Sequence, residues 1–313
     1  MKTFLISGGA GFLGSHLCKT LIKEGKVIAV DNFYTGHMSN LSSLANNPNF
    51  KFINADINQP LSINEKIDYV LNFACPASPP KYQKDPVFTL NTCYKGLANM
   101  LDLARINDAV ILQASTSEIY GDPSQHPQKE SYWGNVNPCG IRSCYDEGKR
   151  VGETLMFAYA QKYKVKIKVI RIFNTYGPYM DNDDGRVVSN FVVQALSEQP
   201  LTIYGNGEQT RSFCYVDDLI VGIVSMLFSE KSFQGPVNIG ASFEFSIKEL
   251  ANIVLALTKS KSTIINKALP SDDPDRRHAD ISLARQKLGF NPQTTLEEGL
   301  KKTIEYFSNK INR

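Results

Sequence analysis

The chain has 313 residues, which is enough for about two ordinary domains or one large α/β unit with an elaborated second half. Hydrophobic residues at 42% and charged residues at 21% lie near the globular average, which excludes a disordered or highly charged chain. The 34 lysines and arginines and the 31 aspartates and glutamates leave a formal net charge of +3, too small to indicate nucleic acid or an anionic membrane as a partner.

The sequence shows no sign of a membrane span, a leader or a metal motif. Its longest strongly apolar run, residues 219–228, is ten residues long, whereas a spanning helix needs about 20. The N-terminal apolar run has neither the length nor the cleavage context of a signal peptide. The six cysteines form no CxxC pair, and the four histidines show no clustered spacing. We therefore expect a cytoplasmic protein that starts at Met1, with reduced thiols and no metal.

Short apolar runs alternate with amphipathic segments through the first half of the chain. The pattern predicts strands over residues 3–7, 27–31, 50–56, 69–74, 110–115 and 165–173, and helices over residues 12–24, 91–105 and 145–164. Strands that alternate with helices indicate a parallel sheet covered on both faces. The predicted fold class is therefore α/β, with a doubly wound parallel Rossmann sheet of six or seven strands.

The character of the sequence changes after residue 173. A Gly177-Pro178 pair and a turn-forming run over residues 181–185 precede a helical stretch over residues 188–198. We expect a Rossmann domain over residues 1–173 and a smaller α/β substrate-binding domain over residues 174–313. A strand near residues 236–240 returns to the main sheet, so a segment near 213–240 is assigned to the first domain.

A glycine motif lies between the first predicted strand and the first predicted helix. Residues 9–14 read G-x-G-x-x-G, and Gly8 extends the pattern. Such glycines permit a tight turn, let backbone N–H groups approach a pyrophosphate and allow close packing of helix on strand. The sequence therefore predicts a dinucleotide phosphate site at Gly8, Gly11, Phe12, Leu13 and Gly14.

An acidic residue ends the second predicted strand, about 20 residues after the glycine motif. Asp31 can accept hydrogen bonds from both ribose hydroxyls and would repel a 2′-phosphate, so NAD is favoured over NADP. Asp56 and Ile57, after the third predicted strand, would lie beside the adenine. The predicted cofactor set also includes Asn32, Ala74, Tyr145 and Lys149.

Tyr145 and Lys149 are four residues apart, so a helix places the phenol and the ammonium on one face. The ordinary pKa of tyrosine is about 10. A neighbouring ammonium and the positive nicotinamide ring both stabilise a phenolate, so the pair predicts a tyrosine base that works near neutral pH. The spacing becomes specific beside the glycine motif and the strand-end run at residues 114–121.

Several longer motifs carry a family resemblance. They are ACPASPP (74–80), STSE (115–118), YWG (132–134), CYDEGKR (144–150), FNTYGP (173–178), DGRVVSNF (184–191) and QTRSF (209–213). Through them nearly the whole chain resembles the extended short-chain dehydrogenase/reductase family of nucleotide-sugar epimerases, dehydratases and decarboxylases. Among the branches of that family, the UDP-glucuronate decarboxylases are the most similar.

The resemblance implies NAD as cofactor, a nucleotide-diphosphate sugar as substrate and oxidation at C4 of the sugar. Tyr145 would remove the proton of the 4-hydroxyl, Lys149 would hold the phenolate and a ribose hydroxyl, and Thr116 would bond the 4-oxygen. Glu118 and Arg277 match positions linked to sugar handling and decarboxylation. The residues that match the grip on the nucleotide diphosphate are Asn174, Arg186, Tyr204 and Arg211.

The resemblance also implies a homodimer, formed through two helices per subunit near residues 91–105 and 145–164. Read without the family, some of the same residues have ordinary interpretations. Glu118 is then a strand-end acid, Arg277 belongs to a solvated charged turn over residues 272–278, and two further arginines pair with surface acids. Those two are Arg186 and Arg211.

Three positions depart from the decarboxylase pattern. Asn91 and Cys93 stand where a lysine and an asparagine are usual, and Tyr179 replaces an arginine. A lost cation removes a charge-assisted bond to a substrate carboxylate, typically about 1.5–3 kcal/mol. A 4-dehydrogenase or 4-epimerase on a neutral hexose or heptose linked to UDP or GDP is therefore the alternative. A 4,6-dehydratase is disfavoured because Ser117 replaces the usual Asp, and a non-catalytic NAD sensor is a further alternative.

Overall fold

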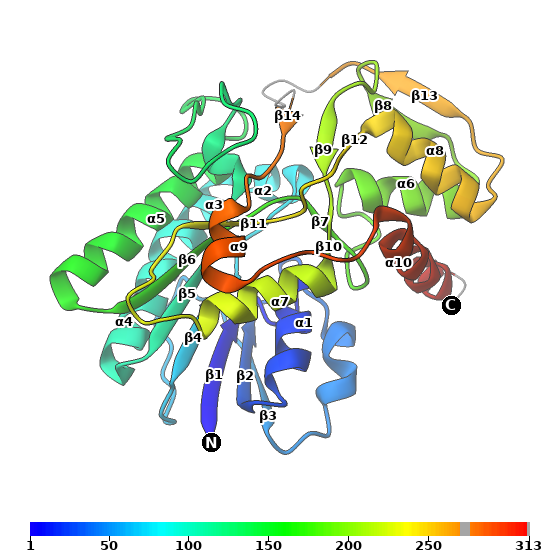
Figure 1. Cartoon of the computed structure of the whole chain (residues 1–313). Coiled ribbons are helices and arrows are strands. Elements are labelled where there is room, and N and C mark those ends of the chain that lie inside the picture. Colours follow the sequence, from blue (N-terminus) through cyan, green and yellow to red (C-terminus); the bar gives the residue numbers. More distant parts are fainter. Residues whose placement is uncertain (270–275, 312–313) are drawn as a thin grey trace.

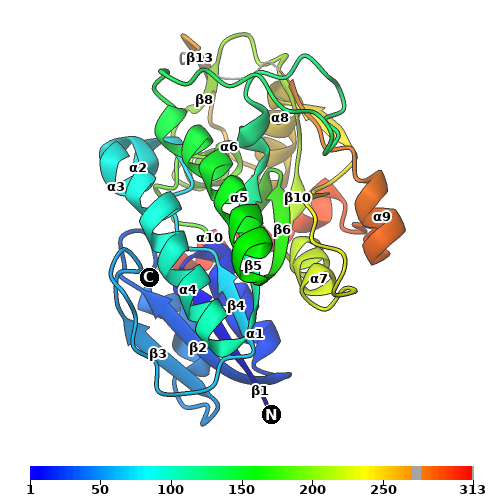
Figure 2. The ribbon, with the colours of Figure 1, turned by 90° about the vertical axis from the view of Figure 1, so that its left-hand side faces the viewer.

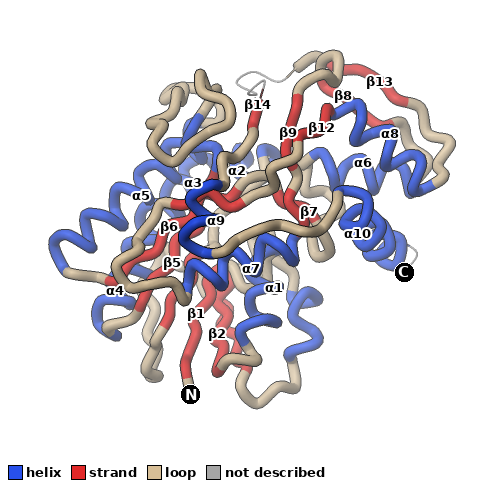
Figure 3. Tube along the Cα trace, in the orientation of Figure 1, coloured by secondary structure: helices blue, strands red, loops and turns tan. Residues whose placement is uncertain are grey.

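The computed structural model describes residues 1–269 and 276–311. Its main sheet has seven strands in the order β11-β6-β5-β4-β1-β2-β3, and every pair in it is parallel (Figures 1 and 3). These strands are β1 (Lys2–Ser7), β2 (Gly25–Asp31), β3 (Phe50–Asn54), β4 (Tyr69–Asn72), β5 (Val110–Thr116), β6 (Lys166–Ile172) and β11 (Val237–Ile239). The predicted doubly wound sheet is confirmed, with seven strands.

Helices cover both faces of this sheet because alternate side chains of each strand point to opposite faces. Phe4 and Ile6 of β1 belong to one core with α1 (Phe12–Leu21) and α7 (Val216–Leu227). Leu5 belongs to a second core with α4 (Leu97–Asn107) and α5 (Ser143–Tyr163). Figure 2 views the molecule from the side of α4 and α5.

The helix predicted over residues 91–105 is in fact three consecutive segments. The chain runs from α3 (Pro86–Asn91) through a π-helical turn (Thr92–Gly96) into α4. Asp85 caps the start, because its side chain accepts a hydrogen bond from the backbone N–H of Phe88 at 2.9 Å. The π-helical turn widens the helical path at Cys93. Turns of this kind often occur at functional sites.

The second half of the chain forms smaller units above the main sheet (Figure 1). Three of its helices, α6, α8 and α10, contact one another, and β12, β9 and β14 form a three-stranded sheet. The further elements are α2 (Pro79–Lys84), β7 (Thr175–Tyr176), α6 (Val187–Leu196), β8 (Leu201–Tyr204), β9 (Thr210–Ser212), β10 (Cys214–Tyr215), β12 (Glu244–Ser246), α8 (Ile247–Thr258), β13 (Ile264–Lys267), β14 (Arg276–Arg277), α9 (Ser282–Leu288) and α10 (Leu296–Ile311). The predicted return to the main sheet near residues 236–240 is confirmed, since β11 pairs with β6. In the described ranges, the helices fall short of the length and apolarity that crossing a membrane requires.

Candidate active site

One cleft of about 880 Å³ opens at the carboxyl ends of the parallel strands. It brings together every residue that the sequence predicted for cofactor, catalysis or substrate: Gly8, Gly11, Phe12, Leu13, Gly14, Asp31, Asn32, Asp56, Ile57, Ala74, Thr116, Glu118, Tyr145, Lys149, Asn174, Arg186, Tyr204, Arg211 and Arg277. The strands predicted over residues 50–56 and 69–74 end two residues earlier than expected, at Asn54 and Asn72. The residues beyond those ends leave the sheet and line the cleft, which explains the difference.

The glycine loop forms a backbone cradle at the start of α1. Gly8 has φ +70°, which favours glycine, and the N–H of Gly11 donates to its carbonyl at 3.1 Å. A Cβ at Gly14 would lie 1.9 Å from the Gly8 oxygen. No described side chain caps the helix at Gly11, so its first N–H groups face the cleft. A small anionic group fits this cradle.

Asp31 is a fixed acceptor at the end of β2. Its two oxygens accept backbone N–H groups of Phe33 at 2.8 Å and Ala10 at 3.0 Å. Burial raises the pKa of Asp31, while these two hydrogen bonds oppose the rise. The Asp56 side chain accepts the N–H of Asn58 at 2.8 Å, which positions the turn after β3.

Tyr145 lies in the first turn of α5 and is buried. Its ring stacks on that of Tyr82, with centroids 4.9 Å apart and planes 7° from parallel. The ammonium of Lys149 is 5.6 Å from the centroid of the Tyr145 ring and donates to the carbonyl of Ala114 at 2.9 Å. The helix thus places phenol and ammonium on one face, as predicted.

The groups of the protein that surround Tyr145 oppose ionisation of its phenol. Burial raises the pKa of this phenol well above its ordinary value, and the nearby Cys75 and Glu118 act in the same direction. A hydrogen bond with Thr116 opposes the rise. The sequence interpretation relied on the ammonium and the nicotinamide ring acting together, so a base that works near neutral pH stays a prediction.

Glu118 is clamped between two arginines. The guanidinium of Arg277 contacts one oxygen of Glu118 at 2.6 Å and the other at 2.8 Å. The guanidinium of Arg142 forms a further ion pair with this carboxylate. Burial alone raises the pKa of Glu118, but Arg277 and Arg142 outweigh it and hold the pKa below its ordinary value. The carboxylate is thus ionised and paired, and neither Glu118 nor Arg277 is a solvated surface group. Residues 270–275, and with them most of the predicted charged turn over 272–278, lie outside the described residues.

Arg142 lines the cleft and was missed by the sequence interpretation, and Asp146 lies beside it. Burial and the charge of Glu118 raise the pKa of Asp146 to about 7. The Asp146 carboxylate lies 3.8 Å from the Arg142 guanidinium. The helix face of Tyr145 and Lys149 also includes Arg142 and Asp146, because the four residues have the spacing i, i+3, i+4, i+7. Helical periodicity could therefore have identified Arg142 and Asp146 from the sequence.

The predicted nucleotide-binding residues differ in their surroundings. Arg186 pairs with both oxygens of Asp184, at 2.5 Å and 2.7 Å, but Asp184 is buried and is not the surface acid of the ordinary interpretation. Arg211 is buried and donates to the Thr210 carbonyl at 2.8 Å. Tyr204 is 42% exposed at the end of β8, and Asn174 lies between β6 and β7.

Two of the three positions that depart from the decarboxylase pattern, Cys93 and Tyr179, make contacts in or beside the cleft. Cys93 is buried, and its sulfur lies 3.4 Å from that of Cys75, which lines the cleft. The hydrogen bond from Cys93 lowers the pKa of Cys75, although burial opposes this. Tyr179 lines the cleft, and the centroid of its ring lies 3.3 Å from the ammonium of Lys19.

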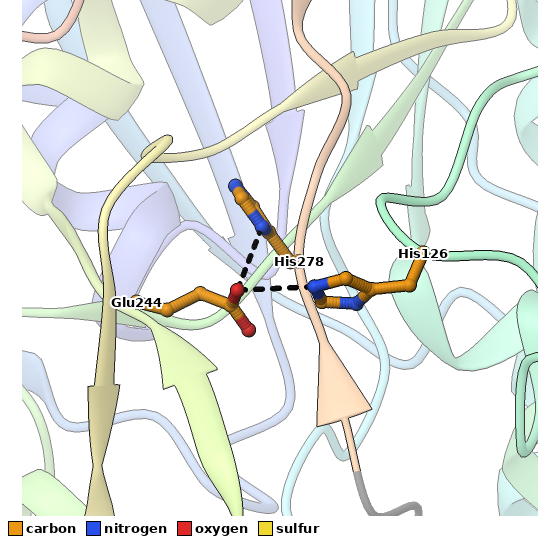
Figure 4. A group of neighbouring side chains, drawn as sticks. All are labelled: His126, Glu244 and His278. Carbon is orange, nitrogen blue, oxygen red and sulfur yellow. Dashed lines mark hydrogen bonds and ion pairs between the residues drawn. The ribbon is translucent and has the colours of Figure 1, made fainter.

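The expectation that the histidines do not cluster is wrong. His126 and His278 meet at the carboxylate of Glu244 (Figure 4). These residues come from three distant segments, so no local spacing could have indicated the cluster.

Comparisons with known proteins place this cleft in a family. Residues 5–303 match the family model described as GDP-mannose 4,6 dehydratase. The chain belongs to the extended short-chain dehydrogenase/reductase family. It is 49% identical to UDP-glucuronic acid decarboxylase 1 of Arabidopsis thaliana, over 98% of this chain and 70% of that protein. It is 50% identical to UDP-glucuronic acid decarboxylase 1 of Danio rerio, over 99% of this chain and 73% of that protein.

Solved structures of the family have the same fold. UDP-glucuronic acid 4-epimerase of Bacillus cereus, solved with UDP-glucuronic acid and NAD, superposes with a TM-score of 0.89 at 29% identity, over 98% of this chain and 99% of that one. UDP-glucose 4-epimerase of Thermotoga maritima, solved with UDP-glucose, has a TM-score of 0.89 at 27% identity over 99% of both chains. The sequence matches and the structural superpositions therefore support the same family assignment.

Proposed function

We propose that this protein is an NAD-dependent UDP-glucuronate decarboxylase that oxidises C4 of its nucleotide-linked sugar. The choice of substrate depends on sequence identity. About half of the residues, over nearly the whole chain, are identical to those of proteins named UDP-glucuronic acid decarboxylase. Family members share a fold but differ in chemistry, so the cleft must supply the remaining support.

The cleft fits the cofactor. The backbone turn of Gly8, Gly11 and Gly14 would hold a pyrophosphate, and the turn depends on glycine because a Cβ at Gly14 would lie 1.9 Å from the Gly8 oxygen. Asp31 is held at the place where a ribose would follow. NAD bound there would supply the oxidation at C4 and its later reversal.

Tyr145, Lys149 and Thr116 are proposed to move the proton at the sugar. The phenol would take the proton of the 4-hydroxyl as the 4-ketone forms, and Thr116 would hold the same oxygen. Because burial raises the pKa of Tyr145, the positive charge needed to form the phenolate must come from Lys149 together with the cationic nicotinamide ring.

The 4-ketone makes the second half of the reaction possible. A carboxylate on C5 is then β to a carbonyl, so loss of CO₂ leaves an electron pair that the carbonyl oxygen accepts as an enolate. Glu118 is ionised and paired with two guanidinium groups, so we assign it and Arg277 to positioning the sugar and not to proton donation.

The second candidate is a 4-epimerase or 4-dehydrogenase that retains the sugar carbons. It is favoured by Asn91 and Cys93, because they replace the lysine and the asparagine of the decarboxylase pattern and the Cys93 sulfur lies 3.4 Å from that of Cys75. Ser117 disfavours a dehydratase. Intact Thr116, Tyr145 and Lys149 disfavour a sensor without catalysis.

The deciding experiment offers the purified protein NAD and a panel of UDP-glucuronate, UDP-glucose, UDP-galactose and GDP-mannose. We expect UDP-glucuronate to lose CO₂ and give a UDP-pentose in the mass spectrum. A UDP-hexuronate epimer or a 4-keto sugar without CO₂ would support the second candidate. If UDP-glucuronate remains unchanged while a neutral sugar reacts, the decarboxylase proposal is wrong.

We expect Gly14→Ala to weaken NAD binding by about 10- to 100-fold, equivalent to the ~1–3 kcal/mol of an overpacked contact. The new methyl group would meet the backbone oxygen of Gly8 at 1.9 Å, and the cradle would have to open. Calorimetric titration with NAD measures the effect. Gly152→Ala is the control, because its Cβ would lie 3.4 Å from Leu97 in ordinary space. Equal NAD affinity in both variants would count against the phosphate cradle.

We propose a homodimer, a cytoplasmic location and two domains as further properties. The adjoining segments α3, the π turn and α5 expose Val87, Leu90, Tyr94 and Val151, which suits a helical dimer interface. The six free cysteines suit a reducing compartment. Residues 1–173, with a returning segment near 213–240, are proposed to hold the cofactor, and residues 174–313 the nucleotide sugar.

A further inference from the structure

Three side chains converge outside the catalytic cleft (Figure 4). His126 lies in the loop after β5, Glu244 begins β12, and His278 directly follows β14. One oxygen of Glu244 lies 3.0 Å from Nε2 of His126 and 3.1 Å from Nδ1 of His278. The three candidate ligand atoms all lie within 4.8 Å of one another.

The cluster is held in place from outside. The second oxygen of Glu244 accepts the hydroxyl of Thr210 at 2.8 Å. The backbone N–H of His278 donates to the Gln128 side chain at 2.8 Å, and its carbonyl accepts the Gln128 N–H at 2.9 Å. Metal ligands in proteins are usually oriented by supporting hydrogen bonds of this kind.

The charges around the cluster favour a cation. The carboxylate of Glu244 is the acidic group that faces both imidazoles, and the Thr210 hydroxyl is its further partner. Asp280 adds a second negative charge close to His278, and Lys129 is the nearby cation that acts on Asp280. Side-chain exposures of 31% for His126, 25% for Glu244 and 18% for His278 leave an approach from solvent.

We propose that His126, Glu244 and His278 form a binding site for a divalent transition-metal ion of the zinc class. Two imidazole nitrogens and one carboxylate oxygen are a known three-residue donor set for zinc, with water in the fourth position. Binding would replace the two histidine–glutamate hydrogen bonds. Each imidazole would shift its proton to the nitrogen that faces away from Glu244, so both histidines bind as neutral ligands.

The bound ion would tie together β12, the loop that carries His126 and the segment after β14. Arg277, which clamps Glu118, is the residue immediately before His278. Occupancy of the site would therefore stabilise the wall of the catalytic cleft without contact with the sugar. Metal binding is measured directly, and its result does not depend on the proposed reaction.

The test titrates ZnCl₂ into the full chain after dialysis against EDTA, at a pH above about 7, because protons compete with the metal ion for imidazole nitrogens. The Cys139→Ser background removes the exposed thiol among the six cysteines, all of which are described. We expect one ion per chain and a higher Tm with zinc, but no effect of MgCl₂. His126→Gln and Glu244→Gln should each weaken zinc binding at least about tenfold, and Thr210→Val by about 10- to 100-fold.

His37→Ala is the matched control, because His37 pairs with a single carboxylate, Asp181, at 3.1 Å. It should leave zinc binding unchanged. Circular dichroism and the Tm without zinc establish that each variant is folded, and His126→Gln, at the most exposed of the three ligands, is the variant least able to disturb the fold. Absence of zinc binding by the parent protein, or equal binding in folded His126→Gln and Glu244→Gln, would overturn the proposal.

Discussion

Tyr145→Phe is expected to lower kcat by about 100- to 10,000-fold, the usual contribution of a positioned general base. The change removes one oxygen from a buried ring that keeps its stacking on Tyr82. Because the glycine cradle and Asp31 are untouched, NAD affinity should stay the same. Product formation by mass spectrometry and calorimetric titration with NAD measure the two effects separately.

Tyr82→Phe is the matched control for that variant. Tyr82 is stacked directly on Tyr145, and its buried hydroxyl has no hydrogen-bond partner among the described residues. Loss of this hydroxyl should therefore change kcat little. Near-normal turnover in Tyr145→Phe, or equal losses in both variants, would refute the assignment of Tyr145 as the base.

Glu118→Gln is expected to lower the free energy of unfolding by about 3–5 kcal/mol, the usual effect of removing one partner from a buried ion pair. Arg142 and Arg277 both approach this carboxylate, and all three side chains are almost completely buried. The neutral amide would leave two buried guanidinium groups facing each other. Urea unfolding of wild type and variant measures the difference.

The loss in Glu118→Gln should depend on pH in a defined direction. The folded-state pKa of Glu118 lies below its unfolded value, so its contribution is fully present above the ordinary pKa of a glutamate. The contribution then disappears as the pH falls through the folded-state pKa. We therefore expect the stability difference between wild type and variant to be largest at neutral pH and to shrink in acid.

An exposed ion pair provides the control for the buried one. Glu147 lies 3.4 Å from Arg150 on the same helix, with both side chains more than a third exposed. Glu147→Gln should change the free energy of unfolding by no more than about 1 kcal/mol. If Glu118→Gln is as mild as Glu147→Gln, the two arginines must be neutralised by other groups, and the role of Glu118 as their shared anion is wrong.

Much of the fold and of the cofactor site could be predicted from contiguous stretches of chain. The alternation of apolar runs predicted the parallel sheet, and the glycine motif directly after β1 predicted the cradle that Gly8 and Gly14 form. Tyr145 and Lys149 share a helix face because they are four residues apart. Features of this kind depend on periodicity and backbone conformation, which neighbouring residues specify.

The ionic part of the site arises from contacts between distant segments. Arg277 reaches Glu118 across 159 residues, and Cys93 meets Cys75 from another element. His126, Glu244 and His278 also converge only after folding. Burial and pairing set the pKa values of Glu118 and Tyr145, and both depend on which remote groups surround a side chain. Spacing along the chain therefore identified the phenol and the ammonium, whereas long-range packing set their electrostatic surroundings.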